Sequence, residues 1–354
     1  MEEEATMDDL TQTAAAVATL PATFYNDPQG LARERDVVFR RTWQLVGREA
    51  DLADTGDFLA EDIGGAPIVV VRTADGALRG HHNLCRHRAG PLVLESRGNC
   101  GRELVCRYHG WRYELDGRLR AAVDFGAAQG FDPRRFGLHA VRVDTWRGLV
   151  FVNLDPDAPS LEETLVPVER VWREHGVALP PSFAVGKSYE LGCDWKVYVE
   201  NFLEGYHLPT VHPGLTEEVD THGYFISVDN GVAVQQAIRL PNRRAVNQGL
   251  WVWLWPNLGM SLYNGGMMIE RIAPAGFGRT RLDYFYFYDP ETGADLDNIL
   301  AVSARTTAED IVICEGVQKR LNGGIYQQGV LSPRHETAIG WFQSRIRQVH
   351  AEAT

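Results

Sequence analysis

Two short cysteine–histidine pairs stand out in the chain because their side chains can bind metal. Cys85 and His87 have one residue between them, and Cys106 and His109 have two. On neighbouring loops, the pairs could converge on one metal centre. A zinc site would place all four side chains on one ion. A two-iron, two-sulfide cluster would take both cysteines on one iron and both histidines on the other. Zinc signatures usually pair like with like, so the mixed pairs favour the cluster and leave zinc as the alternative.

A second candidate metal site lies in the segment that contains His207 and His212. Two histidines five positions apart do not share one helical face, where neighbours are three or four apart. Pro209 between them provides a break that lets His212 turn back toward His207. Two imidazoles and one carboxylate form the facial triad of a mononuclear Fe(II) site, which keeps open positions for O2.

Asp310 is the candidate for the missing carboxylate. It shares an apolar stripe of a predicted helix, whose members at helical spacing are Asp310, Cys314, Val317 and Leu321. An acid on a buried stripe is costly unless it is paired or bound to metal, although a helix cap or a buried ion pair would also explain it. Glu309 and Glu315 lie off this stripe and are expected to be solvated.

The elements that position the first site are short strands. Apolar runs separated by Asp/Gly turns predict hairpins at Ala66–Arg72, Leu78–His82, Leu104–Cys106, Arg112–Leu115 and Val141–Leu154. We therefore expect a small antiparallel β domain over residues 46–155, with the Cys/His pairs at hairpin tips. Residues 1–45 are expected to form an acidic lead-in followed by a helix at Pro28–Trp43.

Residues 156–354 predict a second domain. Strand-forming runs at 184–191, 232–240, 250–255, 260–263, 267–273 and 280–288 indicate one large antiparallel sheet. Helices are expected at Trp195–Tyr206, where Pro209 would end the helix, at Asp295–Leu321 and at Ala338–Ala351. The fold class is therefore α+β, with helices packed on one face of the sheet.

Composition narrows the function classes. The chain has 354 residues and a net charge of −12, which argues against binding to nucleic acid or to an anionic membrane surface. Five cysteines, an acidic start and the lack of a long apolar run predict a cytoplasmic protein without disulfides or a membrane span.

Several stretches resemble the catalytic (alpha) subunits of Rieske non-haem iron oxygenases. These are CRHRAGPL and YHGWRYELDG around the first site and WKVYVENFLEGYHLPTVHP around the second, and the resemblance extends from about Tyr25 to Gln348. Ala89 is a departure, because the family more often has glycine there. The resemblance implies a Rieske [2Fe–2S] domain followed by a helix-grip catalytic domain.

The resemblance also implies roles for individual residues. Cys85, His87, Cys106 and His109 would hold the cluster, with Trp111 and its backbone hydrogen-bonding the sulfurs. His207, His212 and Asp310 would hold Fe(II), where O2 reacts. Glu204 would connect the two centres across a subunit boundary of a homotrimer, and Asn201 would orient a neighbouring group. Electrons would come from a separate NAD(P)H-dependent reductase, because the chain has no GxGxxG nucleotide-binding motif of its own.

The substrate is expected to be a small molecule. Glu204, where the family usually has aspartate, resembles the branch that hydroxylates or demethylates quaternary amines such as carnitine, choline and betaine. Candidate pocket residues are Phe202, Tyr206, Trp253 and Tyr263. The alternation of Trp251, Trp253 and Trp255 is more typical of a sheet face packed on a core.

Three alternatives remain at this level. An enzyme of the same family could act on an aromatic ring or aryl ether. Outside enzymes, the chain could be a zinc-stabilised ligand-binding protein, or an electron carrier with the cluster alone. An electron carrier would need only the first site, so the second set of candidate ligands, His207, His212 and Asp310, argues against it.

Overall fold

The computed structural model describes residues 16–177, 182–241 and 245–352. Contacts divide the chain into two compact units. The smaller unit is Ala32–Val166, and the larger unit combines the N-terminal segment through Leu31 with residues from Pro167 onward. The boundaries expected near residues 45 and 155 stay predictions, and each unit is described by itself.

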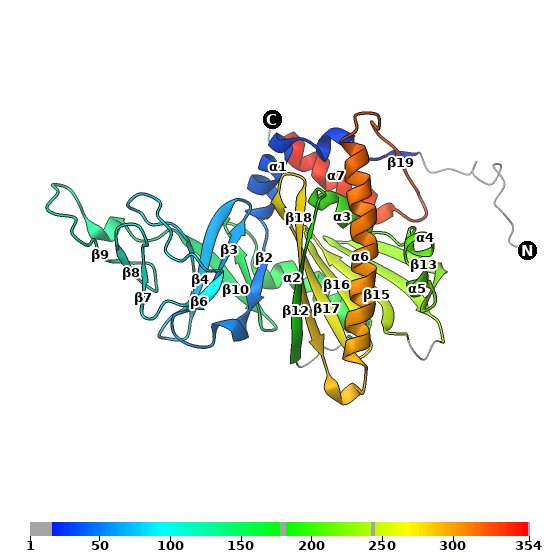
Figure 1. Cartoon of the computed structure of the whole chain (residues 1–354), viewed down its shortest axis with the longest axis horizontal. Coiled ribbons are helices and arrows are strands. Elements are labelled where there is room, and N and C mark those ends of the chain that lie inside the picture. Colours follow the sequence, from blue (N-terminus) through cyan, green and yellow to red (C-terminus); the bar gives the residue numbers. More distant parts are fainter. Residues whose placement is uncertain (1–15, 178–181, 242–244, 353–354) are drawn as a thin grey trace, which may run out of the picture. The chain divides into compact units, whose positions relative to one another are not determined.

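The smaller unit contains two antiparallel sheets (Figure 1). The strand order is β2-β11-β10-β5-β4-β3-β6 in the seven-stranded sheet and β7-β8-β9 in the three-stranded sheet. The strands are β2 (Gln44–Arg48), β3 (Asp57–Ile63), β4 (Ala66–Arg72), β5 (Leu78–His82), β6 (Arg97–Asn99), β7 (Glu103–Val105), β8 (Arg112–Glu114), β9 (Leu119–Ala121), β10 (Ala140–Trp146) and β11 (Leu149–Asn153). The expected hairpins are confirmed, since consecutive pairs such as β4 and β5 are antiparallel neighbours.

Strand β4 explains how this unit is held together. Its residues alternate between two hydrophobic clusters, because successive side chains point to opposite faces of a sheet. Val69 and Val71 pack with Cys85 and Trp111, while Ile68 packs into the other cluster. The two cysteines of the first site are therefore part of a buried hydrophobic cluster.

The larger unit is built on one seven-stranded antiparallel sheet with the order β12-β18-β17-β16-β15-β14-β13. Its strands are β12 (Ser182–Leu191), β13 (Val219–Asp229), β14 (Val232–Arg239), β15 (Asn247–Leu254), β16 (Leu258–Tyr263), β17 (Gly266–Gly276) and β18 (Arg279–Tyr288). The helices are α2 (Leu161–Glu174, which begins in the smaller unit), α3 (Trp195–Phe202), α4 (Leu208–Val211), α5 (Pro213–Thr216), α6 (Leu296–Leu321) and α7 (Thr337–Glu352).

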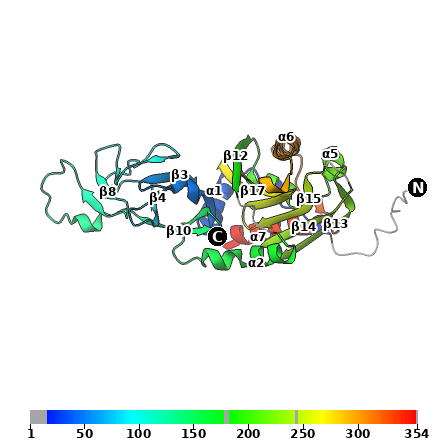
Figure 2. The same cartoon turned by 90° about the horizontal axis from the view of Figure 1, so that it is seen from below.

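Helices cover both faces of this sheet, so the expectation of one covered face is wrong. On one face, Tyr286 of β18 hydrogen-bonds Ser303 of α6 at 2.7 Å. On the other, Gln236 of β14 hydrogen-bonds His175, which follows α2. Gln235 points into the α6 side, and its neighbour Gln236 must point the opposite way. Figure 2 shows α6 and α2 on opposite sides of the strands.

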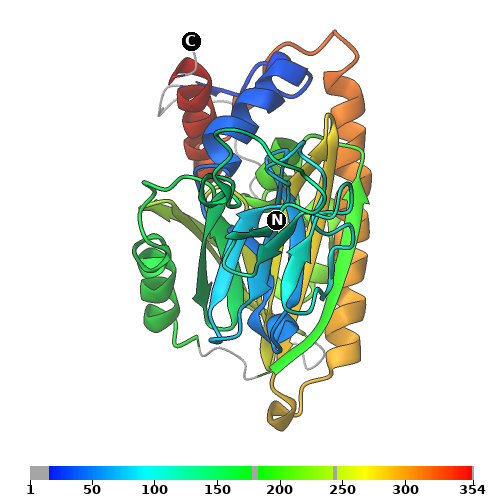
Figure 3. The ribbon, with the colours of Figure 1, turned by 90° about the vertical axis from the view of Figure 1, so that its left-hand side faces the viewer.

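The N-terminal segment belongs to the larger unit through several contacts. Strand β1 (Val17–Ala18) pairs with β19 (Val330–Leu331), and the amide of Leu20 donates to Gln343 of α7 at 2.8 Å. Phe24 packs on His350 with ring centroids 4.7 Å apart, and Figure 3 shows this blue segment beside the red α7. The helix expected at 28–43 is shorter: α1 (Pro28–Glu34) continues into the π-helical turn η3 (Arg35–Phe39). No helix among the described residues is long and apolar enough to cross a membrane.

Candidate metal centres and active site

The two Cys/His loops of the smaller unit are built on the same closed turn. The amide of Cys85 donates to the carbonyl of Gly90 at 2.8 Å, and the amide of Ala89 returns to the carbonyl of Cys85 at 3.0 Å. The second loop repeats both bonds at the same distances, with Cys106 bonded to Trp111 and Gly110. The fourth residue after each cysteine has a left-handed backbone, with φ of 53° at Ala89 and 71° at Gly110. This requirement explains why glycine suits the position of Ala89.

The two thiols and two imidazoles lie together at these turns. Cys85 and Cys106 are buried, and the rings of His87 and His109 are 4.7 Å apart. A Cβ on Gly90 would lie 2.9 Å from the sulfur of Cys106, which shows how closely the two loops approach. The structure thus brings the four predicted side chains together.

The surroundings of these side chains fit a metal cluster. Nδ1 of His87 is buried and has no hydrogen-bond partner among the described atoms, as expected of a nitrogen that binds metal. Burial raises the pKa of the Cys85 thiol, so the thiolate needs a metal to stabilise it. Among the described residues, these four do not form a group with all ligand atoms within 4.8 Å of one another.

Of the predicted role of Trp111 and its backbone, the backbone part agrees with the amide of Tyr108, which lies 3.5 Å from Sγ of Cys106, whereas the Trp111 ring lies elsewhere. That ring stacks on His87 at 5.0 Å with an interplanar angle of 8°, so it shields an imidazole. The hydroxyl that meets sulfur belongs to Tyr113, which lies 3.1 Å from Sγ of Cys85 and accepts from the amide of Arg86 at 3.0 Å. Tyr113 was missed because spacing alone does not show which strand residue points back at the loop.

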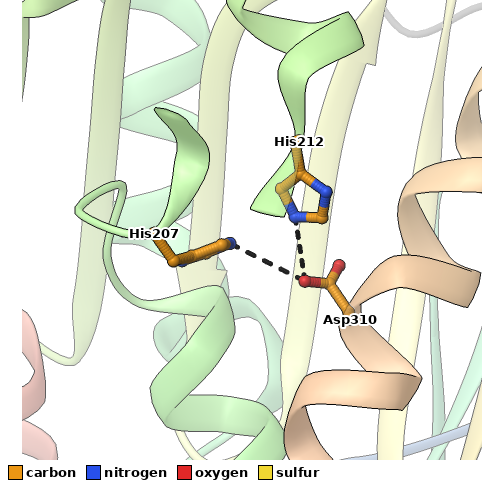
Figure 4. Close-up of side chains that lie close together, drawn as sticks. All are labelled: His207, His212 and Asp310. Carbon is orange, nitrogen blue, oxygen red and sulfur yellow. Dashed lines mark hydrogen bonds and ion pairs between the residues drawn. The ribbon is translucent and has the colours of Figure 1, made fainter. Parts of the chain in front are cut away.

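The second site forms where α3, α4 and α6 meet. Helix α3 ends at Phe202, and Pro209 lies inside α4 instead of ending α3. This break places His207 before α4 and His212 between α4 and α5. Nε2 of His212 lies 2.9 Å from Oδ1 of Asp310, and Nε2 of His207 lies 3.7 Å from the same oxygen (Figure 4). The predicted triad therefore converges, with its ligand atoms within 4.8 Å of one another.

Each histidine of the triad is hydrogen-bonded through its Nδ1 to a glutamate carboxylate. Nδ1 of His207 lies 2.6 Å from Oε1 of Glu204, and Nδ1 of His212 lies 2.7 Å from Oε2 of Glu309. The expectation that Glu309 is merely solvated is therefore wrong. Burial alone would lower the pKa of His212, but the hydrogen bonds and charges of Asp310 and Glu309 raise it. A carboxylate on Nδ1 fixes the ring and leaves Nε2 for a metal.

Glu204 and Asn201 both lie next to His207. The Glu204 carboxylate also accepts from the amides of Tyr206 and His207, so its bonds in this chain are local. The side-chain amide of Asn201 lies 3.5 Å from Nε2 of His207. Asn201 therefore faces the triad, at the limit of hydrogen-bond distance.

A cavity of about 90 Å³ opens onto the triad. One water molecule needs only about 10–15 Å³, so the cavity can hold a small organic group. Phe202 and Tyr263 line it, as predicted, and so does Trp251. Trp253 does not, because its ring is fully buried against Trp341 and Phe342 of α7.

Tyr206 also does not line the cavity. It is 59% exposed, and its ring stacks on His335 at 4.7 Å. The cavity residues that the sequence analysis missed include Tyr198 on α3, Glu270 on β17 and Tyr284 on β18. The sequence holds a signal for Glu270, because an acid within an apolar strand needs a partner or a cavity.

Comparison with known proteins agrees with this geometry. Residues 42–131 match the Rieske [2Fe-2S] domain, and residues 183–352 match the ring hydroxylating alpha subunit (catalytic domain). Choline monooxygenase of Arabidopsis thaliana is 30% identical over 334 residues, which cover 88% of this chain and 78% of that protein. The chain belongs to the Rieske oxygenases. The carnitine monooxygenase oxygenase subunit of Escherichia coli K12 is 29% identical, over 94% of this chain and 93% of that protein.

A solved relative gives the same result for this Rieske oxygenase. A quaternary ammonium Rieske monooxygenase, crystallised with an inhibitor, superposes with a TM-score of 0.82 at 27% identity, covering 95% of this chain and 96% of that one. The expected architecture is confirmed, as is an oxidoreductase that uses a Rieske [2Fe–2S] cluster, mononuclear iron and O2. The zinc-protein and electron-carrier alternatives are thereby excluded, and these relatives do not support the aromatic alternative.

Proposed function

We propose that this chain is the terminal oxygenase component that hydroxylates or N-demethylates a small quaternary amine. The observation that carries the proposal is the convergence of His207, His212 and Asp310 on a cavity that can hold a small organic group. The choline and carnitine monooxygenases among the relatives support the substrate class.

The side chains divide between two centres. Cys85 and Cys106 would hold one iron of the cluster, and His87 and His109 the other. His207, His212 and Asp310 would hold the mononuclear iron. When bound, these metals supply the electron transfer and the O2 chemistry.

The remaining polar residues would fix these ligands. Glu204 and Glu309 accept from the Nδ1–H groups of His207 and His212, which holds each imidazole with Nε2 toward the metal. Asn201 would orient a group beside His207. Phe202 and Tyr263 would form apolar walls that position the substrate and exclude water.

A separate NAD(P)H-dependent reductase and a homotrimer complete the proposal, in the cytoplasm. A surface of α6 and the segment after it supports subunit association, because its large apolar side chains are exposed: Val312, Ile313, Val317 and Ile325. Glu204 lines the groove beside this surface. In an assembled trimer it would connect His207 to a cluster histidine of a neighbouring subunit.

The proposal is tested in two steps. Purified protein should be brown, contain about three irons per chain without zinc, and give a Rieske-type EPR signal when reduced. Chemically reduced protein is then mixed with O2 and choline, carnitine or glycine betaine, and products are identified by mass spectrometry. Asp310→Ala should keep the cluster signal and form no product. Product from aromatic ethers but from no quaternary amine would overturn the proposed substrate class.

A further inference from the structure

Glu270 is a buried acid in the catalytic cavity without a role in holding metal. It lies within β17, where its cross-strand neighbours are Gly259 of β16 and Tyr284 of β18. The side chain is 1% exposed and lines the same cavity as the triad. Because Gly259 has no side chain, the ring of Phe202 approaches the strand there, and a Cβ on Gly259 would lie 2.9 Å from it. The acid is therefore set among aromatic rings.

Within the described residues, no cation acts on the carboxyl of Glu270. Its Oε1 is buried without a hydrogen-bond partner. Burial raises the pKa of Glu270 to about 8, and the charge of Asp310 adds to the rise, while hydrogen bonds from Tyr198 and Tyr284 oppose it. The negative charge of Glu270 is thus poorly compensated by the protein itself.

Two other buried charges of the larger unit are held in ion pairs. Nζ of Lys196 lies 2.7 Å from Oδ1 of Asp194. Arg271, the residue after Glu270, lies 2.5 Å from Asp283. A buried charge without a compensating charge destabilises the folded protein. An acid that lacks a cationic partner and faces a cavity is explained if the compensating charge arrives with a ligand.

We propose that Glu270 binds the cationic head group of the substrate and selects it over neutral molecules of the same shape. This inference rests on the proposed function and assigns its substrate selectivity to one residue. A quaternary ammonium group has no N–H to donate, so it is recognised by opposite charge and by aromatic faces. Glu270 supplies the charge, and Trp251 and Tyr263 supply the faces.

Selection follows from the cost of an unpaired group. A neutral substrate would displace water from the cavity and leave the carboxyl desolvated without a partner. Shape alone discriminates between isosteres by roughly 10–200-fold, whereas an unpaired buried polar group raises discrimination to about 10⁴-fold or more. Removal of the acid should therefore reduce preference for the cation and leave the affinity for a neutral isostere unchanged or improved.

The test uses choline and 3,3-dimethylbutan-1-ol, which share a shape and differ in charge. Binding of each is measured by anaerobic calorimetry on metal-loaded wild type, Glu270→Gln and Glu270→Met. Glu200→Gln is the matched control, because Glu200 is also a largely buried acid but does not line this cavity. We expect the preference of wild type for choline to fall at least tenfold in both Glu270 variants and to persist in the control.

Thermal unfolding of the same variants separates selection from a structural role. Removal of an uncompensated buried acid should leave the midpoint of ligand-free protein unchanged or raise it. The inference is overturned if either Glu270 variant that keeps its cluster signal also keeps the full preference for choline, or if both variants lose the fold. If wild type binds no choline and converts no quaternary amine, the proposed function fails together with the inference. If wild type converts a quaternary amine but the Glu270 variants keep the full preference for choline, only the inference fails.

Discussion

Nδ1 of His212 lies 2.7 Å from Oε2 of Glu309, a residue whose position on the helix suggests nothing more than a solvated surface. The bond joins α6 to the segment between α4 and α5. The two bonded residues, His212 and Glu309, are 97 residues apart in sequence. It holds one imidazole of the triad from the side opposite Asp310. The rigidity of the site therefore depends on an acid that is not itself a metal ligand.

Glu309→Gln should weaken iron binding at the triad by about 10–100-fold, because a neutral amide supports the ring of His212 less strongly than a carboxylate does. Iron retention is measured by competition with a chelator, using the cluster EPR signal as an internal reference. Glu315→Gln is the control on the same helix and should retain iron like wild type. Equal iron retention in both variants would show that the Glu309 bond is not needed.

Tyr113→Phe should lower the reduction potential of the cluster. Hydrogen bonds to the sulfurs stabilise the more negatively charged reduced form, and this change removes the hydroxyl 3.1 Å from Sγ of Cys85. The potential is measured by a redox titration followed by EPR. Tyr108→Phe, which keeps the ring stacked on His109, is the matched control and should leave the potential near that of wild type. A potential unchanged in Tyr113→Phe would contradict the assignment.

Ala89→Gly should stabilise the first cluster loop by about 0.5–1 kcal/mol. A left-handed conformation costs a residue with a Cβ about 1–2 kcal/mol, and glycine avoids this cost. Glycine also loses more backbone entropy on folding, which offsets part of the stabilisation. The change is measured as slower loss of cluster absorbance on heating. Ala140→Gly, in the extended strand β10, should have the opposite effect. Faster loss in Ala89→Gly would mean that the alanine side chain has a contact worth keeping.

Glu200→Gln should raise the thermal midpoint by an amount that grows with pH. Burial raises the pKa of Glu200 from its ordinary 4.5 to about 7, although hydrogen bonds from Tyr25 and Gln343 oppose the rise. The folded state therefore holds a proton that the unfolded state releases, so wild-type stability falls as pH rises from about 4.5 through 7. The glutamine lacks this loss, which amounts to at most about 3 kcal/mol.

The measurement compares the midpoints of wild type and variant at pH 5 and pH 8. A difference that is the same at both values would show that Glu200 keeps an ordinary pKa in the folded protein.

The sequence predicts the strands better than it predicts the site's surroundings. Strands β4 and β5 have their predicted bounds because apolar runs end at clear turns. Strand β13 was missed because, of its residues, only Val219 is buried, so it has no apolar run. The triad follows from residue type and spacing. Trp251 and Trp253 share one strand face, and only the packing of α7 decides that the second is removed from the cavity.

The closed turn that occurs twice in the smaller unit makes ligand chemistry independent of folding. Each turn satisfies its own backbone through two hydrogen bonds, and the histidine stands second after Cys85 but third after Cys106. The backbone of each turn therefore does not depend on which metal-binding side chain it carries. Exchange of a histidine for a cysteine would change the cluster's electronic character while keeping its cradle, which makes this pair of turns a natural starting point for redesigning the redox range of the enzyme.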